Sequence, residues 1–586
     1  MRPTILLLTL LCSYNLSFGQ LSVRNSEYIF ITDEIIFVED FIHISESTSS
    51  IYLRDDAQII QGSGSTGNSG IGFLSVQQYG DVNPYAYNYW CSPIGNADSD
   101  TSTNENFRVN LIDDAIGVIT SNDASFTNNH NGISSPLTIS KTWLYTFEAQ
   151  SSYSGWNYVG EAGNISPGLG FTMKGTDHPT FEQLYEFRGK PNNGTISNTI
   201  LNNQLTLIGN PYPSVLDART FIWDTENKSI ITGTLYYWEQ KNGNSHNLNS
   251  YEGGYATYTI SEDGLLESSV PATFITYNGD GTPTNIPVGN GIKSPTRYIP
   301  IGQGFMVEGK ADGVVKTKND QRTYVKNNAF SLRTTSESNA VNIEGPELTD
   351  EGFVLVPAPY QRFRINVDFN DTYTRQLMMN FHPSATDEFD YGLETTSPDI
   401  LASDAYWLVN TDECNTQALA FDLDLHIPLI VQVNSTQSIN FRPCDIQNFD
   451  DTQGLFLHDK ETGIYTNLRE QDYTILMDSG LYANRFEIVF EVPTLGIPDG
   501  TDKVFNIYQN NNEGKLVIEN PKNIDVSEIT LYDIQGRQVV TPYSPSVIQS
   551  EYTIDTNSLQ DGVYIALIKS IDNVSSSQKV IIKNEN

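Results

Sequence analysis

The sequence predicts an all-β, multidomain protein made of β-sandwich-like modules with a duplicated central lobe. Short runs of β-branched and aromatic residues recur at small intervals, and Gly, Asn, Asp and Pro residues separate them, as strands and turns require. No long run of helical periodicity follows the first residues. The 586 residues exceed the usual length of one domain, so we expect several modules.

Motif positions and changes in composition divide the chain into segments. We expect a signal peptide at 1–19, an N-terminal β segment at 20–85, two copies of a β lobe at 86–200 and 201–335, a β domain at 340–492, a linker at 493–503 and a C-terminal β-sandwich sorting domain at 504–586. Close, even spacing of short runs between residues 20 and 80 predicts a small β-sheet or a solenoid-like start. Gly and Pro among polar residues make 493–503 typical of an exposed linker.

The first residues have the form of a secretory signal peptide. Arg2 precedes an apolar run at 5–11, and Ser17 and Gly19 place small residues at −3 and −1 of a cut before Gln20. The apolar run is too short to span a membrane, and no later stretch reaches the roughly 18 apolar residues that a membrane helix needs. We therefore expect an exported chain without a transmembrane segment.

The middle of the chain contains an internal repeat. The first copy opens with YWCSPIGN at 89–96 and closes with PGLGFTMKG at 167–175, and the second opens with LIGNPYPS at 207–214 and closes with PIGQGFMVEG at 300–309. Both closing motifs contain Gly-x-Gly-Phe, which predicts a tight turn that leads into a strand. Within the second copy, Ser214 and Asp217 resemble a capping box and predict one short helix over 215–222.

The repeat region also carries candidate ligand-stacking residues, namely Trp143, Tyr145, Tyr237 and Trp238. Aromatic rings of this kind can form a platform for sugar rings. Aromatic residues are also enriched in strands, where they pack in the core. Core packing is the simpler interpretation of all four.

The β domain contains a candidate metal site. Asp387, Asp390 and Glu394 cluster in one polar stretch, and hard oxygen ligands at close spacing can hold Ca²⁺. The stretch does not match the EF-hand pattern, and an ordinary acidic loop is the alternative. Ca²⁺ is the only cofactor for which the sequence offers candidate ligands.

The cysteines have two expected roles. Cys414 and Cys444 lie in the same predicted domain, and we expect them to form a disulfide in an oxidising compartment. Cys91 stands between Trp90 and Ser92, where a small buried apolar residue is more plausible than a nucleophile.

The charge balance and the missing motifs narrow the function. Lys and Arg number 33 and Asp and Glu 71, so the net charge is −38, and binding to nucleic acid is excluded because it requires neutralisation of phosphates. Such a charge fits a soluble secreted protein or one that binds divalent cations. The seven His residues are scattered, and the sequence has neither a Gly-x-Ser-x-Gly elbow nor a phosphate-binding loop.

Three patterns near the C-terminus occur in a fixed order: DIQGR at 533–537, LQDGVY at 559–564 and KVIIK at 579–583. Together they resemble the type A sorting domain of type IX secretion cargo in Bacteroidetes. The residues that carry the resemblance are Asp533, Gly536, Arg537, Leu559, Gly562, Tyr564, Lys579 and Lys583. The resemblance implies handling by the type IX machinery, passage through the periplasm, and secretion or display at the cell surface. The repeats resemble stretches of large exported flavobacterial proteins, which implies no particular activity.

Two functions remain from different classes. The first is an adhesive or ligand-binding surface protein whose duplicated lobes present loops to glycans or other surface components. The alternative is a secreted polysaccharide-acting enzyme, because the carboxylate pair of a glycosidase is assembled by the fold and leaves no local motif. The repetition and the lack of a local catalytic signature favour the first.

Overall fold

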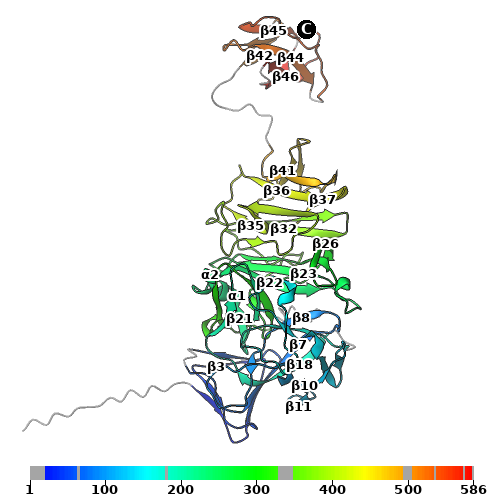
Figure 1. The fold of residues 1–586 in the computed structure, drawn as a ribbon. Helices are drawn as coiled ribbons and strands as arrows, with labels where there is room; N and C mark the ends of the chain where they lie inside the picture. The colour runs from blue at the N-terminus through cyan, green and yellow to red at the C-terminus, as the bar shows by residue number, and fades with distance from the viewer. Residues whose placement is uncertain are drawn as a thin grey trace, which may run out of the picture. The chain divides into compact units, whose positions relative to one another are not determined.

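The computed structural model describes residues 20–62, 66–177, 182–326, 347–492, 505–511, 513–533, 536–571 and 575–583. The predicted signal peptide and the predicted linker lie outside these residues. The chain divides into two compact units, Met1–Val492 and Pro493–Asn586. Almost every element is a strand (Figure 1), and the described residues contain two short α-helices, α1 (Ala218–Ile222) and α2 (Asn227–Ile230). The prediction of an all-β protein is confirmed.

The first unit begins with a three-sided parallel coil. Its first turn consists of β1 (Leu21–Val23), β2 (Tyr28–Thr32) and β3 (Ile35–Val38), and its second of β4 (Ile42–Ile44), β5 (Ser50–Arg54) and β6 (Gln58–Gln61). Each strand of the first turn pairs in parallel with its counterpart in the second, and β5 pairs in parallel with β7 (Phe73–Asp81). The solenoid-like start that the spacing indicated is therefore present.

The strands that carry the repeat motifs pair in the same way in both copies: β8 (Tyr87–Trp90) with β17 (Phe171–Lys174), and β20 (Leu205–Gly209) with β28 (Gly304–Gly309). In the first copy Trp90 is opposite Phe171. In the second copy Ile208 is opposite Phe305, and these are the equivalent motif positions. The duplication is thus visible in the strand register.

The two copies also pair with each other. Trp90 of the first opening motif forms a bridge with Gln303 of the second closing motif, and Leu169 of the first closing motif forms one with Ile208 of the second opening motif. Because these positions correspond, the contact is reciprocal and relates the copies by a local pseudo-two-fold axis.

Glycines make this close approach possible. Gly168 and Gly302 have φ angles of 80° and 75°, which confirms the predicted turns. At Gly209 an added Cβ would lie 2.4 Å from the Cβ of Cys91. Cys91 is fully buried, as a small apolar residue should be.

Larger sheets surround the motif strands. The sheet of the first copy continues into the N-terminal segment through β7, β5 and β2, and its order is β11-β10-β18-β7-β5-β2, with β10 (Ile112–Ala115), β11 (Ser121–Asp123) and β18 (Glu182–Pro191). In the second copy it is β20-β28-β22-β23-β25-β26, with β22 (Ile231–Gln240), β23 (Glu252–Ile260), β25 (Thr273–Tyr277) and β26 (Pro283–Asn290). Short strands complete the lobes: β9 (Ile94–Gly95), β12 (Ser125–Thr127), β13 (Ile133–Ser134), β14 (Leu137–Ser140), β15 (Tyr145–Thr146), β16 (Asn157–Tyr158), β19 (Ile196–Ile200), β24 (Glu267–Val270), β27 (Tyr298–Ile299), β29 (Gly313–Thr317) and β30 (Arg322–Thr323).

The helix predicted over 215–222 is shorter than expected. Val215–Asp217 is a strand, β21, and α1 begins at Ala218. The Asp217 carboxylate caps the helix by accepting a hydrogen bond from the backbone N–H of Arg219 at 2.9 Å. The cap is therefore Asp217 rather than Ser214.

The β domain forms one large sheet in the order β39-β38-β41-β36-β34-β35-β32-β31-β37-β40. Its strands are β31 (Gln361–Phe369), β32 (Tyr373–Phe381), β33 (Thr395–Thr396), β34 (Asp404–Val409), β35 (Asp412–Leu419), β36 (His426–Val433), β37 (Gln437–Gln447), β38 (Phe456–Asp459), β39 (Ile464–Asn467), β40 (Tyr473–Met477) and β41 (Gly480–Val489). One face encloses an aromatic core that includes Phe363, Phe381, Trp407 and Phe486.

The second unit is a small sandwich. One sheet contains β42 (Asn506–Asn510), β43 (Lys515–Glu519) and β45 (Glu551–Asp555), and the other contains β44 (Val526–Asp533), β46 (Gly562–Ser570) and β47 (Ser575–Ile582). Both sheets contribute to a single hydrophobic core. Across the described parts of the chain, no helix has the length and apolar character needed to cross a membrane.

Candidate functional site

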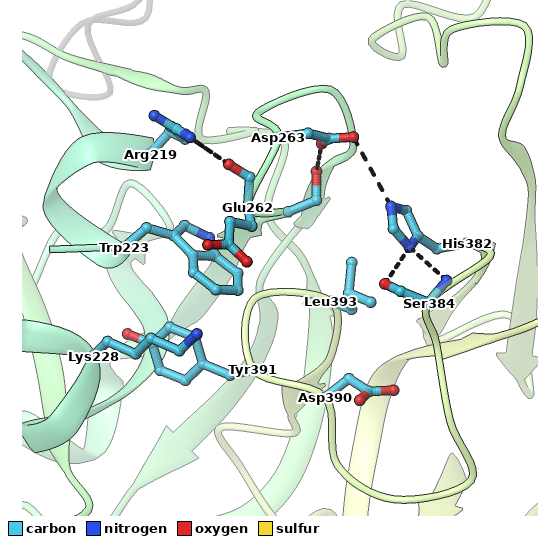
Figure 2. A pocket seen from close by; sticks show the side chains of 11 residues that line it. Arg219, Trp223, Lys228, Glu262, Asp263, His382, Ser384, Asp390, Tyr391 and Leu393 are labelled. Atoms are coloured by element: carbon cyan, nitrogen blue, oxygen red, sulfur yellow. Dashed lines mark hydrogen bonds and ion pairs between the residues drawn. The ribbon is translucent and has the colours of Figure 1, made fainter. Parts of the chain in front are cut away.

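The first unit contains a cavity of about 580 Å³ (Figure 2), a size typical of ligand-binding sites. Its walls come from α1 and α2, from the loop after β23 and from the segment between β32 and β33. The lining residues are Arg219, Trp223, Lys228, Ser261, Glu262, Asp263, His382, Ser384, Asp390, Tyr391 and Leu393.

Backbone contacts hold the Trp223 indole in the pocket wall. Trp223 follows α1 directly, and its Nε1 donates a hydrogen bond to the carbonyl of Ile260 at 2.8 Å. Gly392 adopts a φ of +81°, and an added Cβ there would lie 2.6 Å from the indole ring. The Arg219 guanidinium donates two hydrogen bonds to the carbonyl of Glu262, which fixes the adjoining loop.

Tyr391 supplies a second ring at right angles to the first. The ring centres of Tyr391 and Trp223 are 5.3 Å apart, with an interplanar angle of 89°. The Tyr391 hydroxyl donates to the carbonyl of Ile222 at 2.8 Å. Gly233, with a φ of +90°, makes room for the ring, because an added Cβ would approach it to 2.7 Å. The two rings are therefore positioned before any ligand binds.

Two lysine ammonium groups lie over these rings. The Nζ of Lys228 is 4.1 Å from the Trp223 ring centre and 5.8 Å from that of Tyr391. The Nζ of Lys310 is 4.5 Å from the Tyr391 ring centre. Burial and the nearby charge of Lys228 lower the pKa of Lys310. This side of the pocket is aromatic and cationic.

The opposite wall is polar and acidic. The Asp263 carboxylate accepts hydrogen bonds from the Ser261 hydroxyl at 2.5 Å and from the Tyr360 hydroxyl, and lies 3.9 Å from His382 Nε2. Burial raises the pKa of Asp263, but the hydrogen bonds from Ser261 and Tyr360 lower it by a larger amount, so the net shift is downward. His382 Nδ1 accepts a hydrogen bond from the backbone N–H of Ser384 at 3.2 Å. Figure 2 shows Asp263, His382 and Ser384 together on this wall.

The structure does not assemble the predicted Ca²⁺ ligands. Both oxygens of Glu394 accept backbone hydrogen bonds, from Asp390 at 2.9 Å and from Ala418 at 3.2 Å, and burial raises the pKa of Glu394 to about 7. The Asp390 carboxylate accepts from Thr386, and Asp387 is exposed. Among the described residues, no group of three or more His, Cys, Asp or Glu side chains is placed to hold a metal ion.

The four predicted stacking residues divide into two pairs. Tyr237 is 4% exposed and packs against Phe305 in the core of the second copy. Trp238 is half-buried, is stacked on Tyr89 with ring centres 6.2 Å apart, and packs against a smaller hydrophobic cluster. These two therefore have packing roles.

Trp143 and Tyr145 are half-buried. Trp143 is stacked on His246 at 5.0 Å, and the Nζ of Lys174 lies 3.8 Å from its ring centre. Burial lowers the pKa of Lys174 to about 7. Tyr145 contacts Tyr158, a residue that is 54% exposed. An aromatic surface thus exists here as well, and the Lys174 ammonium group lies over one face of its Trp143 ring.

The structure contradicts the predicted disulfide, because Cys414 and Cys444 are free thiols. Cys414 is on β35 and Cys444 on β37, and β32 and β31 lie between these strands. Three strand spacings of about 4.8 Å exceed the Cα separation that a disulfide tolerates. The side chains also face opposite ways, because Cys414 joins the core whereas the Cys444 sulfur lies 3.3 Å from the side-chain amide of Asn366. The two thiols cannot pair in this fold.

The three C-terminal patterns meet in one sheet. Asp533 on β44 is opposite Tyr564 on β46, which is opposite Val580 on β47. The Asp533 carboxylate accepts hydrogen bonds from the backbone N–H and the Nε of Arg537, both at 2.9 Å. The Tyr564 hydroxyl donates to the carbonyl of Gln560 at 2.8 Å.

The remaining motif residues surround these contacts. Gly536 has a φ of 75° in the turn after Asp533, and Leu559 packs against the core of the sandwich. Gly562 pairs with Ile582, next to Lys583, and Lys579 pairs with Ile565.

A family model described as "Domain of unknown function (DUF8693)" matches residues 120–490, which is more than half of the chain. The chain belongs to the DUF8693 family. The model of the "Secretion system C-terminal sorting domain" matches residues 506–583 of this DUF8693 protein. The chain is therefore cargo of type IX secretion, exported to the cell surface or released.

The search of curated proteins found no match for the DUF8693 protein. Three solved structures that it resembles are Tp47, the 47-kilodalton lipoprotein of Treponema pallidum (10% identity, 62% of this chain and 88% of that chain, TM-score 0.12), the BSP domain of a biofilm associated protein (9%, 76% and 88%, 0.12) and a tetra-tandem repeat in the extending region of a large adhesion protein (9%, 58% and 97%, 0.11). Likenesses at these TM-scores define neither the fold nor the function of this chain.

No local sequence pattern predicts the pocket. Trp223, Asp263, Lys310 and Tyr391 come from separate segments that only the fold brings together. The one local signal was the capped helix, which Trp223 follows directly.

Proposed function

We propose that this type IX cargo is an adhesive, glycan-binding protein, and that the pocket of Figure 2 receives the glycan. The observation that carries the proposal is the pairing of an aromatic wall, Trp223 and Tyr391, with a polar wall that contains Asp263 and His382. Export of the chain to the cell exterior, which its sorting domain provides, supports a role in contact with surface polymers.

The chemistry of a sugar matches these two walls. One face of a sugar ring carries C–H groups, which pack favourably on an aromatic ring, whereas its hydroxyls need hydrogen-bond partners. Asp263 and His382 supply acceptors and donors opposite the Trp223 ring. Because Gly392 and the Ile260 carbonyl already fix the indole, little conformational entropy is lost when a ligand binds.

A glycan array probed with the purified full chain tests this function. We expect binding to a defined set of glycans, and titration calorimetry with one of them should show at least about a tenfold weaker affinity for Trp223→Leu, which removes the aromatic face. Tyr158→Ala is the matched control, since it removes an exposed ring from the other aromatic surface. Unchanged melting temperatures show that the variants fold.

The outcomes separate the alternatives. A full chain that binds no glycan contradicts the proposed function. Binding that Tyr158→Ala abolishes and Trp223→Leu leaves intact contradicts the assignment to the pocket. Release of reducing sugar from a bound glycan by the wild-type chain would instead establish the enzyme alternative.

A further inference from the structure

Lys228 and Lys310 differ from most other lysines of the first unit. In a chain with 33 basic and 71 acidic residues, a lysine usually has a carboxylate at hand. The lysines of the first unit that have a carboxylate partner within 4 Å are Lys141, Lys190, Lys241, Lys293, Lys316, Lys318 and Lys460. Within the described residues, neither Lys228 nor Lys310 has such a partner, although both border the pocket or its Tyr391 wall.

The acidic residues next to Lys228 in sequence are already engaged. Asp224 pairs with Lys318 at 2.7 Å, and Glu226 pairs with both Lys316 and Lys318. These contacts draw both carboxylates toward β29, so neither neutralises Lys228.

The acidic residues near Lys310 and Tyr391 are engaged as well. Asp312 accepts a hydrogen bond from the backbone N–H of Asn202 at 2.9 Å. Asp390 accepts from the backbone N–H of Thr386 at 2.6 Å. Glu262 and Asp263 also line the pocket, but no carboxylate of the described residues lies within 4 Å of either ammonium group.

The backbone holds the two lysines beside the same ring. The N–H of Lys310 donates to the carbonyl of Ile230 at 2.8 Å, which attaches the end of β28 to the end of α2, the helix that carries Lys228. Both ammonium groups lie within 6 Å of the Tyr391 ring centre. The two positive charges repel each other, and a bound anion would reduce that repulsion.

Building on the proposed function, we propose that the glycan is acidic, and that a carboxylate or sulfate on its sugar ring binds to Lys228 and Lys310 while the ring packs on Trp223. The net charge of −38 repels polyanions at long range, so binding of an acidic glycan requires a local cationic site of this kind. The two lysines thus set the ligand class of the pocket, and the aromatic wall accepts the apolar face of the sugar.

Calorimetric titration of the full chain with three probes tests the proposal: oligogalacturonate, which carries carboxylates, dextran sulfate, which carries sulfate esters, and neutral dextran. We expect an acidic probe to bind and neutral dextran to bind at least tenfold more weakly. The double variant Lys228→Gln/Lys310→Gln should lose about tenfold or more in affinity for the acidic probe, because it removes two charge-assisted contacts. Binding should also weaken as salt is raised.

Lys141→Gln/Lys241→Gln is the matched control, since it removes the same charge from lysines that already have carboxylate partners. Its affinity should equal that of the wild type. Comparison of the two acidic probes shows which anion the site prefers. Binding of neutral glycans alone, or acidic-glycan binding that survives Lys228→Gln/Lys310→Gln, overturns this inference and leaves the proposed function standing. A wild-type chain that binds no glycan on the array overturns both.

Discussion

Glu487 on β41 should make the β domain sensitive to acid. Its carboxylate accepts hydrogen bonds from Lys460 Nζ at 2.6 Å, His458 Nδ1 at 2.8 Å and His426 Nδ1 at 3.0 Å. Burial raises the pKa of Glu487, but these three donors outweigh burial and lower the pKa to about 2. The folded-state pKa is thus well below that of the unfolded chain, near 4.5.

The sign and size of the effect follow from this difference. Since the folded-state pKa is depressed, the stabilisation is complete above about pH 4.5 and disappears as the pH falls toward 2. The difference corresponds to at most about 3.4 kcal/mol. His426 is 61% and Lys460 41% exposed in their side chains, so water screens part of the interaction, and we expect about 1–2 kcal/mol.

Hydrogen–deuterium exchange of peptides from β36, β38 and β41 measures this energy locally. At pH 7, Glu487→Gln should exchange roughly five to thirty times faster than the wild type, and the ratio should approach one near pH 2. Glu461→Gln is the control, because the Glu461 side chain is 59% exposed and its pair with Arg485 should contribute less than about 1 kcal/mol. An equal ratio at both pH values would refute the argument.

Three further predictions follow from the structure. Removal of residues 504–586 should leave the rest of the chain folded but in the periplasm; surface display of the truncated chain, measured by protease shaving of intact cells, would contradict this. Mass mapping of unreduced, unfolded protein should find alkylatable thiols at both Cys414 and Cys444, and a disulfide-linked peptide would contradict the fold of the β domain. Gly233→Ala should cost about 1–2 kcal/mol, because its φ is +90°, and should weaken ligand binding by displacing Tyr391; unchanged melting and affinity would count against that packing.

The sequence predicted the features that depend on local residue patterns. Alternation of apolar residues and turn residues indicated strands, and Gly168 and Gly302 take the positive φ that the Gly-x-Gly-Phe turns require. The order of Asp533, Tyr564 and Val580 along the chain indicated the sorting domain, which the family comparison supports. The strand and turn signals need only a few neighbouring residues, and the sorting-domain signal combines three such short patterns.

The features that the sequence did not predict depend on which strands become neighbours. Cys414 and Cys444 share a domain, yet two strands separate them and they face different sides of the sheet. Glu394 lies near other acids in sequence, but its oxygens point to backbone N–H groups. The pocket has the same origin, since Tyr391 reaches Trp223 only through the packing of the β domain on the second lobe.

The reciprocal pairing of the two repeat copies amounts to a homodimer interface enclosed within one polypeptide. Each half supplies the strand edge that the other half lacks: Trp90 meets Gln303, and Ile208 meets Leu169. Neither half can be deleted without exposing the edge of its partner, so the shared motifs are constrained as a pair. The segments between the motifs differ between the two halves: that of the second half contains α1 and α2 and with them the aromatic wall at Trp223.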